Sequence, residues 1–217
     1  MFYKCVSQVK TCLTVAFVVL LSMSVQAEND TYTEAGGVIQ TATHSILKLL
    51  EREELVQEGQ EDQLVAEIDT VLSPVVDFDY ISKQVMGKYY RRASKEQRAE
   101  FSGIFKTTLL KTYAKALVGF KIDKYEMVPP RKDSPDDRKQ IVTVDVFSAD
   151  GTKYTLVYYM KKEAGEWKLV NAILDGSINI RLSFKNQFAD LMERNKGDVG
   201  LVISTWKDKV DPGKDSA

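Results

Sequence analysis

The spacing of apolar residues changes twice along the chain, and these changes restrict the possible folds more than any other feature. Across residues 33–119 apolar side chains recur about every 3.6 residues, as in amphipathic helices, and across residues 122–173 they alternate, as in half-buried strands. The helical spacing returns over residues 178–209. Turns at residues 149–151 and 163–165 are short enough to join antiparallel neighbours. The sequence therefore predicts an α+β fold in which helices precede and follow a curved antiparallel sheet of about four strands.

Local signals predict where several elements end. Asp77 is expected to cap a short helix that Gly87 ends, and Ser94 with Gln97 has the spacing of a capping box. We expect the long helix that follows to end at Gly119. The expected helices cover residues 33–54, 63–72, 78–86, 95–118, 178–195 and a last segment after Asp198, and the expected strands cover residues 122–128, 141–147, 153–160 and 166–173.

Residues 1–27 are typical of an export signal. Lys4 and Lys10 form its positive end, residues 13–21 form its apolar centre, and Val25-Gln-Ala27 is a small-x-small cleavage site. The apolar run of roughly 13 residues is too short for a membrane span, which needs about 20. We expect cleavage after Ala27, one domain over residues 28–209 (a helical part 33–119, a sheet 121–174 and C-terminal helices 178–209), and a flexible tail at residues 210–217.

Reactive side chains are scarce in the expected mature chain. Both cysteines, Cys5 and Cys12, lie in the signal, so disulfides, thiolate catalysis and cysteine-ligated zinc are excluded after cleavage. His44 is the single histidine, which excludes a multi-histidine metal site, and we interpret it as a half-exposed helix residue. The signal holds two of the 30 basic residues and none of the 31 acidic ones, so the mature chain is slightly acidic. That balance argues against a nucleic-acid partner, and we expect no catalytic residue, no metal and no cofactor.

Two charged groups remain as candidates. Asp77 and Asp79 could act as paired carboxylates, although helix capping and solvent exposure explain them more simply. Lys88, Arg91 and Arg92 form a basic cluster between two helices. This cluster could meet a phosphate headgroup or an acidic partner, although such clusters are usually a solvated surface.

The helix expected at residues 95–118 carries an apolar stripe wider than one neighbouring helix would cover. Thr108 and Thr112 interrupt this stripe, and the sheet opposite offers large tyrosines. A concave sheet facing such a helix can enclose a pocket, but the same pattern also fits an ordinary core. The pattern alone leaves both interpretations open.

The segment at residues 75–101 carries three spaced motifs: Asp77-Phe-x2-Ile, Lys88-Tyr-Tyr-Arg and Ser94-x-Glu-Gln-Arg-x2-Phe101. Farther on, Gly165-Glu-Trp-Lys-Leu-Val-Asn171 and Lys185-Asn-Gln-Phe188 follow, with Gly197 near the end. Together these motifs resemble the MlaC family, also called the toluene-tolerance family. Two positions depart from the family pattern: Asn171 replaces an aspartate, and residues 175–179 hold one residue more than the family's loop.

The resemblance implies a soluble periplasmic phospholipid carrier with an NTF2-like or cystatin-like fold. Such a carrier passes lipid between an outer-membrane lipoprotein complex and an inner-membrane ABC transporter with a lipid-binding subunit, and so maintains outer-membrane lipid asymmetry. Its acyl chains lie between the sheet and the helices, and its headgroup stays outside. The resemblance implies a monomer whose bound phospholipid is cargo and not a cofactor.

On this basis we expect the tails to contact one long helix and the sheet, and the basic cluster to dock a partner. The expected contacts are Phe101, Phe105, Leu109 and Tyr113 from the helix, Val142, Val144, Val146, Tyr154, Leu156, Tyr158, Trp167, Leu169 and Ile173 from the sheet, and Val85, Met86 and Phe188 closing the pocket. The partner-docking residues would be Lys88, Arg91 and Arg92.

Two alternatives are an enzyme on an NTF2-like scaffold and a binder of another apolar molecule, such as a sterol-like lipid. An enzyme would use a carboxylate such as Asp145 or Asp175, with a raised pKa, in the pocket. The alternation of the strand predicts that Asp145 faces away from the pocket.

Overall fold

A computed structural model describes residues 30–209 of the chain. The expected export signal, its cleavage site and the tail at residues 210–217 lie outside these residues. Within the described range, no helix is both long enough and apolar enough to cross a membrane. The helices are α1 (Asp30–Leu50), α2 (Glu53–Val56), α3 (Glu61–Leu72), α4 (Phe78–Met86), the 3-10 helix η1 (Gly87–Arg91), α5 (Lys95–Phe120), α6 (Ile180–Arg194) and α7 (Val199–Lys209).

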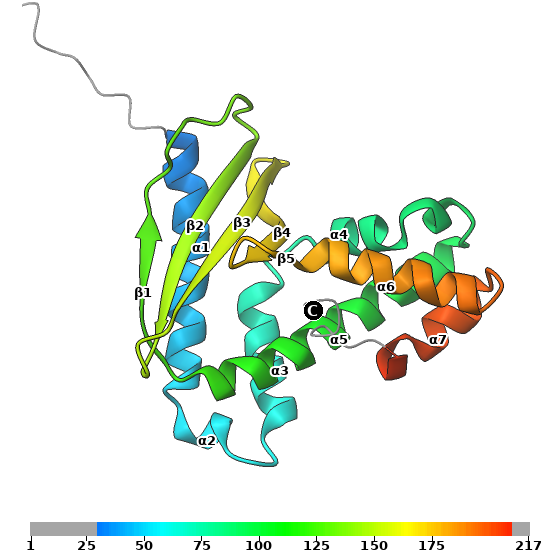
Figure 1. Cartoon of the computed structure of the whole chain (residues 1–217), viewed down its shortest axis with the longest axis horizontal. Helices are drawn as coiled ribbons and strands as arrows, with labels where there is room; N and C mark the ends of the chain where they lie inside the picture. Colours follow the sequence, from blue (N-terminus) through cyan, green and yellow to red (C-terminus); the bar gives the residue numbers. More distant parts are fainter. Residues whose placement is uncertain (1–29, 210–217) are drawn as a thin grey trace, which may run out of the picture. The chain divides into compact units, whose positions relative to one another are not determined.

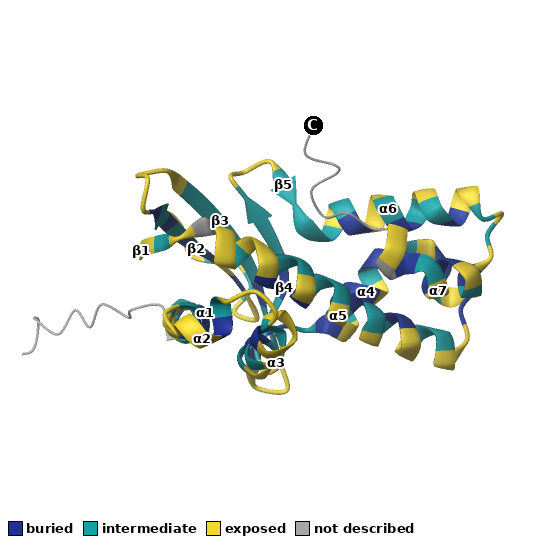
Figure 2. Cartoon of the chain, turned by 90° about the horizontal axis from the view of Figure 1, so that it is seen from below, coloured by how far each residue is buried: buried dark blue, intermediate teal, exposed yellow. Residues whose placement is uncertain are grey.

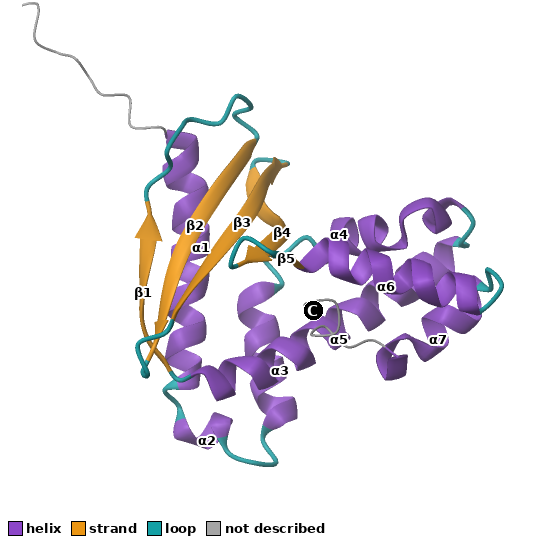
Figure 3. Cartoon of the chain, in the orientation of Figure 1, coloured by secondary structure: helices purple, strands orange, loops and turns teal. Residues whose placement is uncertain are grey.

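One antiparallel sheet stands between the two groups of helices in chain order, which confirms the α+β prediction (Figures 1 and 3). Its strands are adjacent in chain order: β1 (Ile122–Val128), β2 (Lys139–Ser148), β3 (Lys153–Glu163), β4 (Glu166–Leu174) and β5 (Ile178–Asn179).

The fifth strand is a difference from the prediction of about four strands. Ile178 and Asn179, expected to begin a helix, pair instead with the end of β4. The side chain of Asn179 then caps α6, because the Leu182 N–H donates to its Oδ1 at 3.0 Å.

Several predicted helix ends are confirmed by their hydrogen bonds. The Tyr80 N–H donates to Asp77 Oδ1 at 2.8 Å, and the capping box of Ser94 and Gln97 is complete. The predicted end at Gly119 is wrong, because α5 runs on to Phe120 and the left-handed residue after it is Lys121, with φ 41°. The first helix is also shorter than expected, ending at Leu50 before the separate turn α2.

A β-bulge in β4 reverses which side chains face inward. Leu169 lies opposite Met160 and Asn171 lies opposite Tyr159, so Val170 is the extra residue between them. Beyond the bulge, Ile173 pairs with Val157 and so lies on the opposite face of the sheet from Trp167 and Leu169. The prediction that Ile173 shares their face is therefore wrong.

The apolar core is divided into two clusters. In the first, α1 covers part of the inner face of the sheet, with Ala35 and Ile39 packed on Val142 and Val144. The second lies among the helices and is centred on aromatic rings that contact one another. Leu169 is a partly buried residue that packs against both clusters. The sheet and the long helix α5 are thus joined by little shared core.

Candidate functional site

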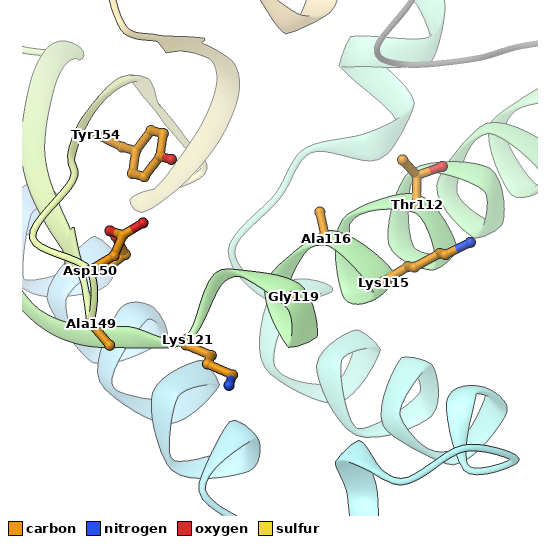
Figure 4. A pocket seen from close by; sticks show the side chains of 9 residues that line it. Thr112, Lys115, Ala116, Gly119, Lys121, Ala149, Asp150 and Tyr154 are labelled. Atoms are coloured by element: carbon orange, nitrogen blue, oxygen red, sulfur yellow. The ribbon is translucent and has the colours of Figure 1, made fainter.

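An open hollow of about 830 Å³ lies between the C-terminal half of α5 and the turn that joins β2 to β3 (Figure 4). The Tyr154 ring and the side chains of Thr112 and Ala116 stand on opposite walls in this view. Its lining consists of small or polar side chains at the mouth: Thr112, Lys115, Ala116, Gly119, Lys121, Ser148, Ala149, Asp150 and Tyr154.

Larger apolar side chains lie next to this lining along β3 and α5. On β3, Leu156 and Tyr158 follow Tyr154 on the same face, because side chains alternate along a strand. On α5, Leu109 and Tyr113 lie three or four residues from Thr112 and Ala116, and are therefore their neighbours on the helix surface. Leu109 packs against the helical cluster, and Leu156 and Tyr158 pack against the α1 cluster.

The inner face of the sheet is covered at one side and open at the other. Val142, Val144 and Val146 of β2 are buried, whereas Tyr158, Leu156 and Tyr154, which lie opposite them on β3, stay partly exposed. Figure 2 shows β3 mainly in the intermediate colour. Helix α1 also reaches β3 and β4, where Met160 and Trp167 are buried in its cluster, so the partly exposed inner face of β3 is limited to Tyr154, Leu156 and Tyr158.

Two tyrosines on the walls are enclosed without being tightly covered. Burial raises the pKa of Tyr158 to about 12 and the pKa of Tyr113 to about 12, yet both residues keep some accessible surface. Both phenols are therefore enclosed by protein on most sides, although neither is among the residues that line the hollow.

Because of these two phenols, the stability of the protein should depend on pH in the alkaline range. Their pKa is near 10 in an unfolded chain but about 12 here, so between pH 10 and 12 the unfolded state ionises first. The free energy of unfolding should fall as the pH rises through this window. We expect Tyr158→Phe to lose less stability than the wild type between pH 9 and pH 11, as measured by urea unfolding. An equal loss in the two proteins would show that Tyr158 is not enclosed.

Five of the expected lipid contacts lie in the helical core and not on the walls of the hollow. Phe101, Phe105, Phe188, Val85 and Met86 are at most 1% exposed. The ring of Phe101 lies 4.9 Å from that of Phe188, and α6 and α7 supply the other side of this cluster. These side chains have partners in the protein itself, so their prediction as pocket residues is not supported.

The remaining sheet residues divide between the hollow and the α1 cluster. Tyr154 lines the hollow, while Leu156 and Tyr158 pack against the α1 cluster that contains Val142, Val144, Val146 and Trp167. Leu109 packs against the helical cluster, Tyr113 is partly exposed on α5, and Leu169 packs against both clusters. Their contact with lipid tails stays a prediction.

Some residues at the mouth were missed by sequence reasoning. Ala116 and Gly119 carry too little apolar surface to mark a stripe, and the turn at residues 148–150 carries no pattern that points to a pocket. Thr112 could have been found from the sequence, because it interrupts the apolar stripe of α5. Lys115 and Lys121 have no ion pair with any residue in the described range, although both lie at the mouth.

The acidic side chain of the lining, Asp150, forms its hydrogen bonds within its own turn. Asp150 accepts hydrogen bonds from the Ser148 hydroxyl and from the Thr152 N–H, the latter at 2.9 Å. These hydrogen bonds, that of Ser148 above all, lower the pKa of Asp150. The carboxylate is therefore ionised and stabilised by local donors, which leaves Lys115 and Lys121 as the charged side chains of the lining that have no ion pair among the described residues.

The carboxylates considered for catalysis all accept hydrogen bonds from residues outside the lining of the hollow. Asp145 faces away from the hollow as predicted and accepts from the Thr155 hydroxyl at 2.6 Å, which with Lys153 lowers its pKa. Asp175 accepts from the Thr155 N–H at 2.7 Å. Asp77 caps α4, Asp79 accepts from the Ser102 hydroxyl, and His44 is exposed on α1. No cluster of three metal-ligating side chains occurs in residues 30–209.

The basic cluster lies at the other end of α5 from the hollow. Lys88 and Arg91 are exposed on η1, and the Arg92 guanidinium lies 5.8 Å from the centre of the Tyr89 ring. Since α5 has 26 residues, its two ends are separated by about 39 Å. A surface at this end could not touch a lipid in the hollow directly.

Comparison with known proteins gives consistent matches. The sequence model of a family described as "MlaC protein" matches residues 40–208. The toluene tolerance protein ttg2D of Pseudomonas putida is 32% identical over 199 residues, which cover 91% of this chain and 88% of that protein. The intermembrane phospholipid transport system binding protein MlaC of Haemophilus influenzae is 27% identical over 136 residues, covering 61% of this chain and 62% of that one.

The fold also matches a solved structure. A phospholipid-binding protein from Ralstonia solanacearum, solved in complex with a phospholipid, superposes with a TM-score of 0.73 at 24% identity. The match covers 81% of this chain and 96% of that protein. The arrangement of helices and sheet therefore has a known precedent.

Proposed function

The chain belongs to the MlaC family, and from this membership and the hollow we propose that it carries phospholipid through the periplasm. It would pass lipid between an outer-membrane lipoprotein complex and an inner-membrane ABC transporter, and so help to maintain outer-membrane lipid asymmetry. It would act as a carrier and not as an enzyme. The observation that supports this proposal best is the hollow between α5 and the β2–β3 turn, beside which Tyr154 and Leu156 of β3 stay partly exposed.

The physics of transport explains why such a carrier needs volume and not catalytic groups. A phospholipid has on the order of 30 tail methylenes, and exposing each to water costs about 0.8 kcal/mol, so escape from a bilayer would cost roughly 20 kcal/mol or more. A protein that offers apolar walls replaces the bilayer as the environment of the tails. Net direction would then come from partners that distinguish the loaded from the empty carrier.

Lipid that co-purifies with the protein tests this proposal. We expect mature protein purified from a bacterial periplasm to release phospholipid into organic solvent, detected by mass spectrometry, at close to one molecule per chain. Protein stripped of lipid should take it up again from vesicles. Absence of both co-purified lipid and uptake would contradict the proposal.

The basic cluster of Lys88, Arg91 and Arg92 is our proposed docking surface for a membrane partner. Lys88 and Arg92 both lie over the Tyr89 ring, at 5.0 Å and 5.8 Å, but Arg92 also lies close to Gly197, so its replacement could disturb the fold and the test uses Lys88 and Arg91. We expect Lys88→Glu/Arg91→Glu to slow lipid transfer to the inner-membrane complex several-fold while uptake from vesicles is unchanged. Lys48→Glu/Lys132→Glu, which makes the same charge change at exposed lysines elsewhere, is the control. Equal transfer rates in both variants would show that this surface does not dock the partner.

A further inference from the structure

A groove of about 500 Å³ lies among α2, the start of α3 and the C-terminal half of α5 (Figure 1). Its apolar lining reaches the surface, because Val56 and Val65 are partly exposed and Val118 is 37% exposed. Within residues 30–209 only three other large apolar side chains are as exposed as Val118, and none of them lines the groove. The groove therefore offers apolar surface that a partner can cover.

Helix α5 separates this groove from the hollow. Ala114 and Val118 line the groove, whereas Ala116 and Gly119 line the hollow, and Lys115 lines both. With 3.6 residues per turn, the first pair and the second pair lie on different sides of the helix. A partner in the groove would therefore contact the helix that forms one wall of the hollow, and would leave the mouth of the hollow open for lipid.

The rim of the groove is acidic. Residues 51–62 contain six acidic residues and one basic residue, all of them exposed. Three of the acids, Glu58, Glu61 and Asp62, line the groove. Asp62 pairs with Lys111 at 3.0 Å, but Glu58 has no ion pair with any residue in the described range. Even when the two lysines of the lining are counted, acids outnumber bases six to three.

This combination of charge and apolar surface decides between occupants. The acidic rim would repel an anionic bilayer. A protein segment that carries basic residues around an apolar side chain matches both the rim and the lining. The basic cluster lies at the opposite end of α5, about 39 Å away. An ordinary interface covers about 800 Å² per partner, or roughly 30 Å across, so a partner at one end leaves the other end free.

We infer that the groove docks a membrane partner through a basic segment that places an apolar side chain against Val118, and that this partner is not the one that meets the basic cluster. With that cluster assigned to the inner-membrane complex, the groove takes the outer-membrane lipoprotein complex. This inference rests on the proposed carrier function. Opposite charges at the two ends of α5 would allow each partner to find its own surface and would disfavour the other.

Lipid exchange with the two complexes tests this docking. Protein loaded with a fluorescent phospholipid is mixed with proteoliposomes that hold the outer-membrane or the inner-membrane complex, or with plain vesicles of phosphatidylethanolamine and phosphatidylglycerol. We expect Glu58→Lys/Val118→Gln to slow exchange with the outer-membrane complex about three- to tenfold and to leave the other two rates unchanged. Both side chains are exposed, so their replacement should not disturb the core.

A matched control and the salt dependence complete the test. Asp123→Lys/Leu182→Gln replaces an exposed acid and an exposed apolar residue elsewhere, and should leave all three rates unchanged. Raising the salt concentration should slow exchange of the wild type with the outer-membrane complex more than exchange of Glu58→Lys/Val118→Gln, because salt screens the attraction between charges.

Equal exchange of Glu58→Lys/Val118→Gln and the control with the outer-membrane complex would overturn the inference and leave the carrier proposal intact. Slower exchange with the inner-membrane complex or with plain vesicles alone would also overturn it. Self-association of the wild type, measured by sedimentation and abolished in Glu58→Lys/Val118→Gln, would make a second copy of the chain the occupant instead. Absence of any lipid exchange by the wild type would overturn the carrier proposal, and the inference with it.

Discussion

Replacing Ala116 with tryptophan is expected to reduce phospholipid uptake at least tenfold while the protein stays folded. Ala116 is exposed and lies on the wall of the hollow, so a larger side chain there meets no packed neighbour. The indole would instead take volume that the tails need. Displacing only three methylenes into water would cost about 2.4 kcal/mol at about 0.8 kcal/mol each, which corresponds to roughly a fiftyfold loss of affinity.

The control for this variant is Thr107→Trp. Thr107 is also exposed on α5, but nine residues away, and therefore on the opposite side of the helix. Uptake from vesicles, followed by mass spectrometry, should be lost in Ala116→Trp and kept in Thr107→Trp, with similar circular dichroism in both. Full uptake by Ala116→Trp would show that the tails bind elsewhere.

The features that the sequence predicted correctly depend on near neighbours in the chain. The caps at Asp77 and Ser94 need only a side chain and an N–H three residues later, and both are observed. The hairpin turns at Gly151 and Gly165 need a positive φ, which both glycines adopt. The change of apolar period predicted the order of helices and strands for the same reason, since each element shows its own period locally.

The features that the sequence did not predict depend on contacts between distant segments. The two-residue strand β5 is too short to have a period and exists because it pairs with β4. The bulge at Val170 moves Ile173 to the other face of the sheet, although the apolar pattern of the sequence shows no break. Helix α5 passes the position expected for its end at Gly119, because a lysine takes the left-handed position two residues later.

The prediction of the pocket residues separated core from pocket poorly for a related reason. Phe101 and Tyr113 lie on the same predicted apolar stripe of α5, yet the first is wholly buried and the second stays partly exposed. What separates them is where α6 and α7 cover the helix, and these helices begin about 60 residues later in the chain. A stripe shows which face of a helix is apolar, but only the tertiary arrangement decides whether that face is filled by protein.

Phe101 lies in the part of α5 that other helices cover, and its replacement is therefore expected to have the second large effect. Phe101→Ala should lower the free energy of unfolding by about 3–5 kcal/mol. Phe101 is 0% exposed, and its ring lies 5.1 Å from that of Trp206 and 5.9 Å from that of Phe105. Truncation would leave a cavity among the rings of Phe105, Phe188 and Trp206, which come from α5, α6 and α7 and cannot easily close it. Urea unfolding followed by circular dichroism measures the loss.

Leu109→Ala is the matched comparison, because Leu109 lies on the same helix but is only partly buried, beside the hollow. We expect it to cost clearly less stability than Phe101→Ala and to weaken lipid uptake more. Both measurements require protein stripped of lipid, since a ligand that binds only the folded state would raise the apparent stability of the wild type and of any variant that still binds. Equal losses of stability in the two variants would mean that the hollow is packed as tightly as the core, and tails could then enter only by displacing protein.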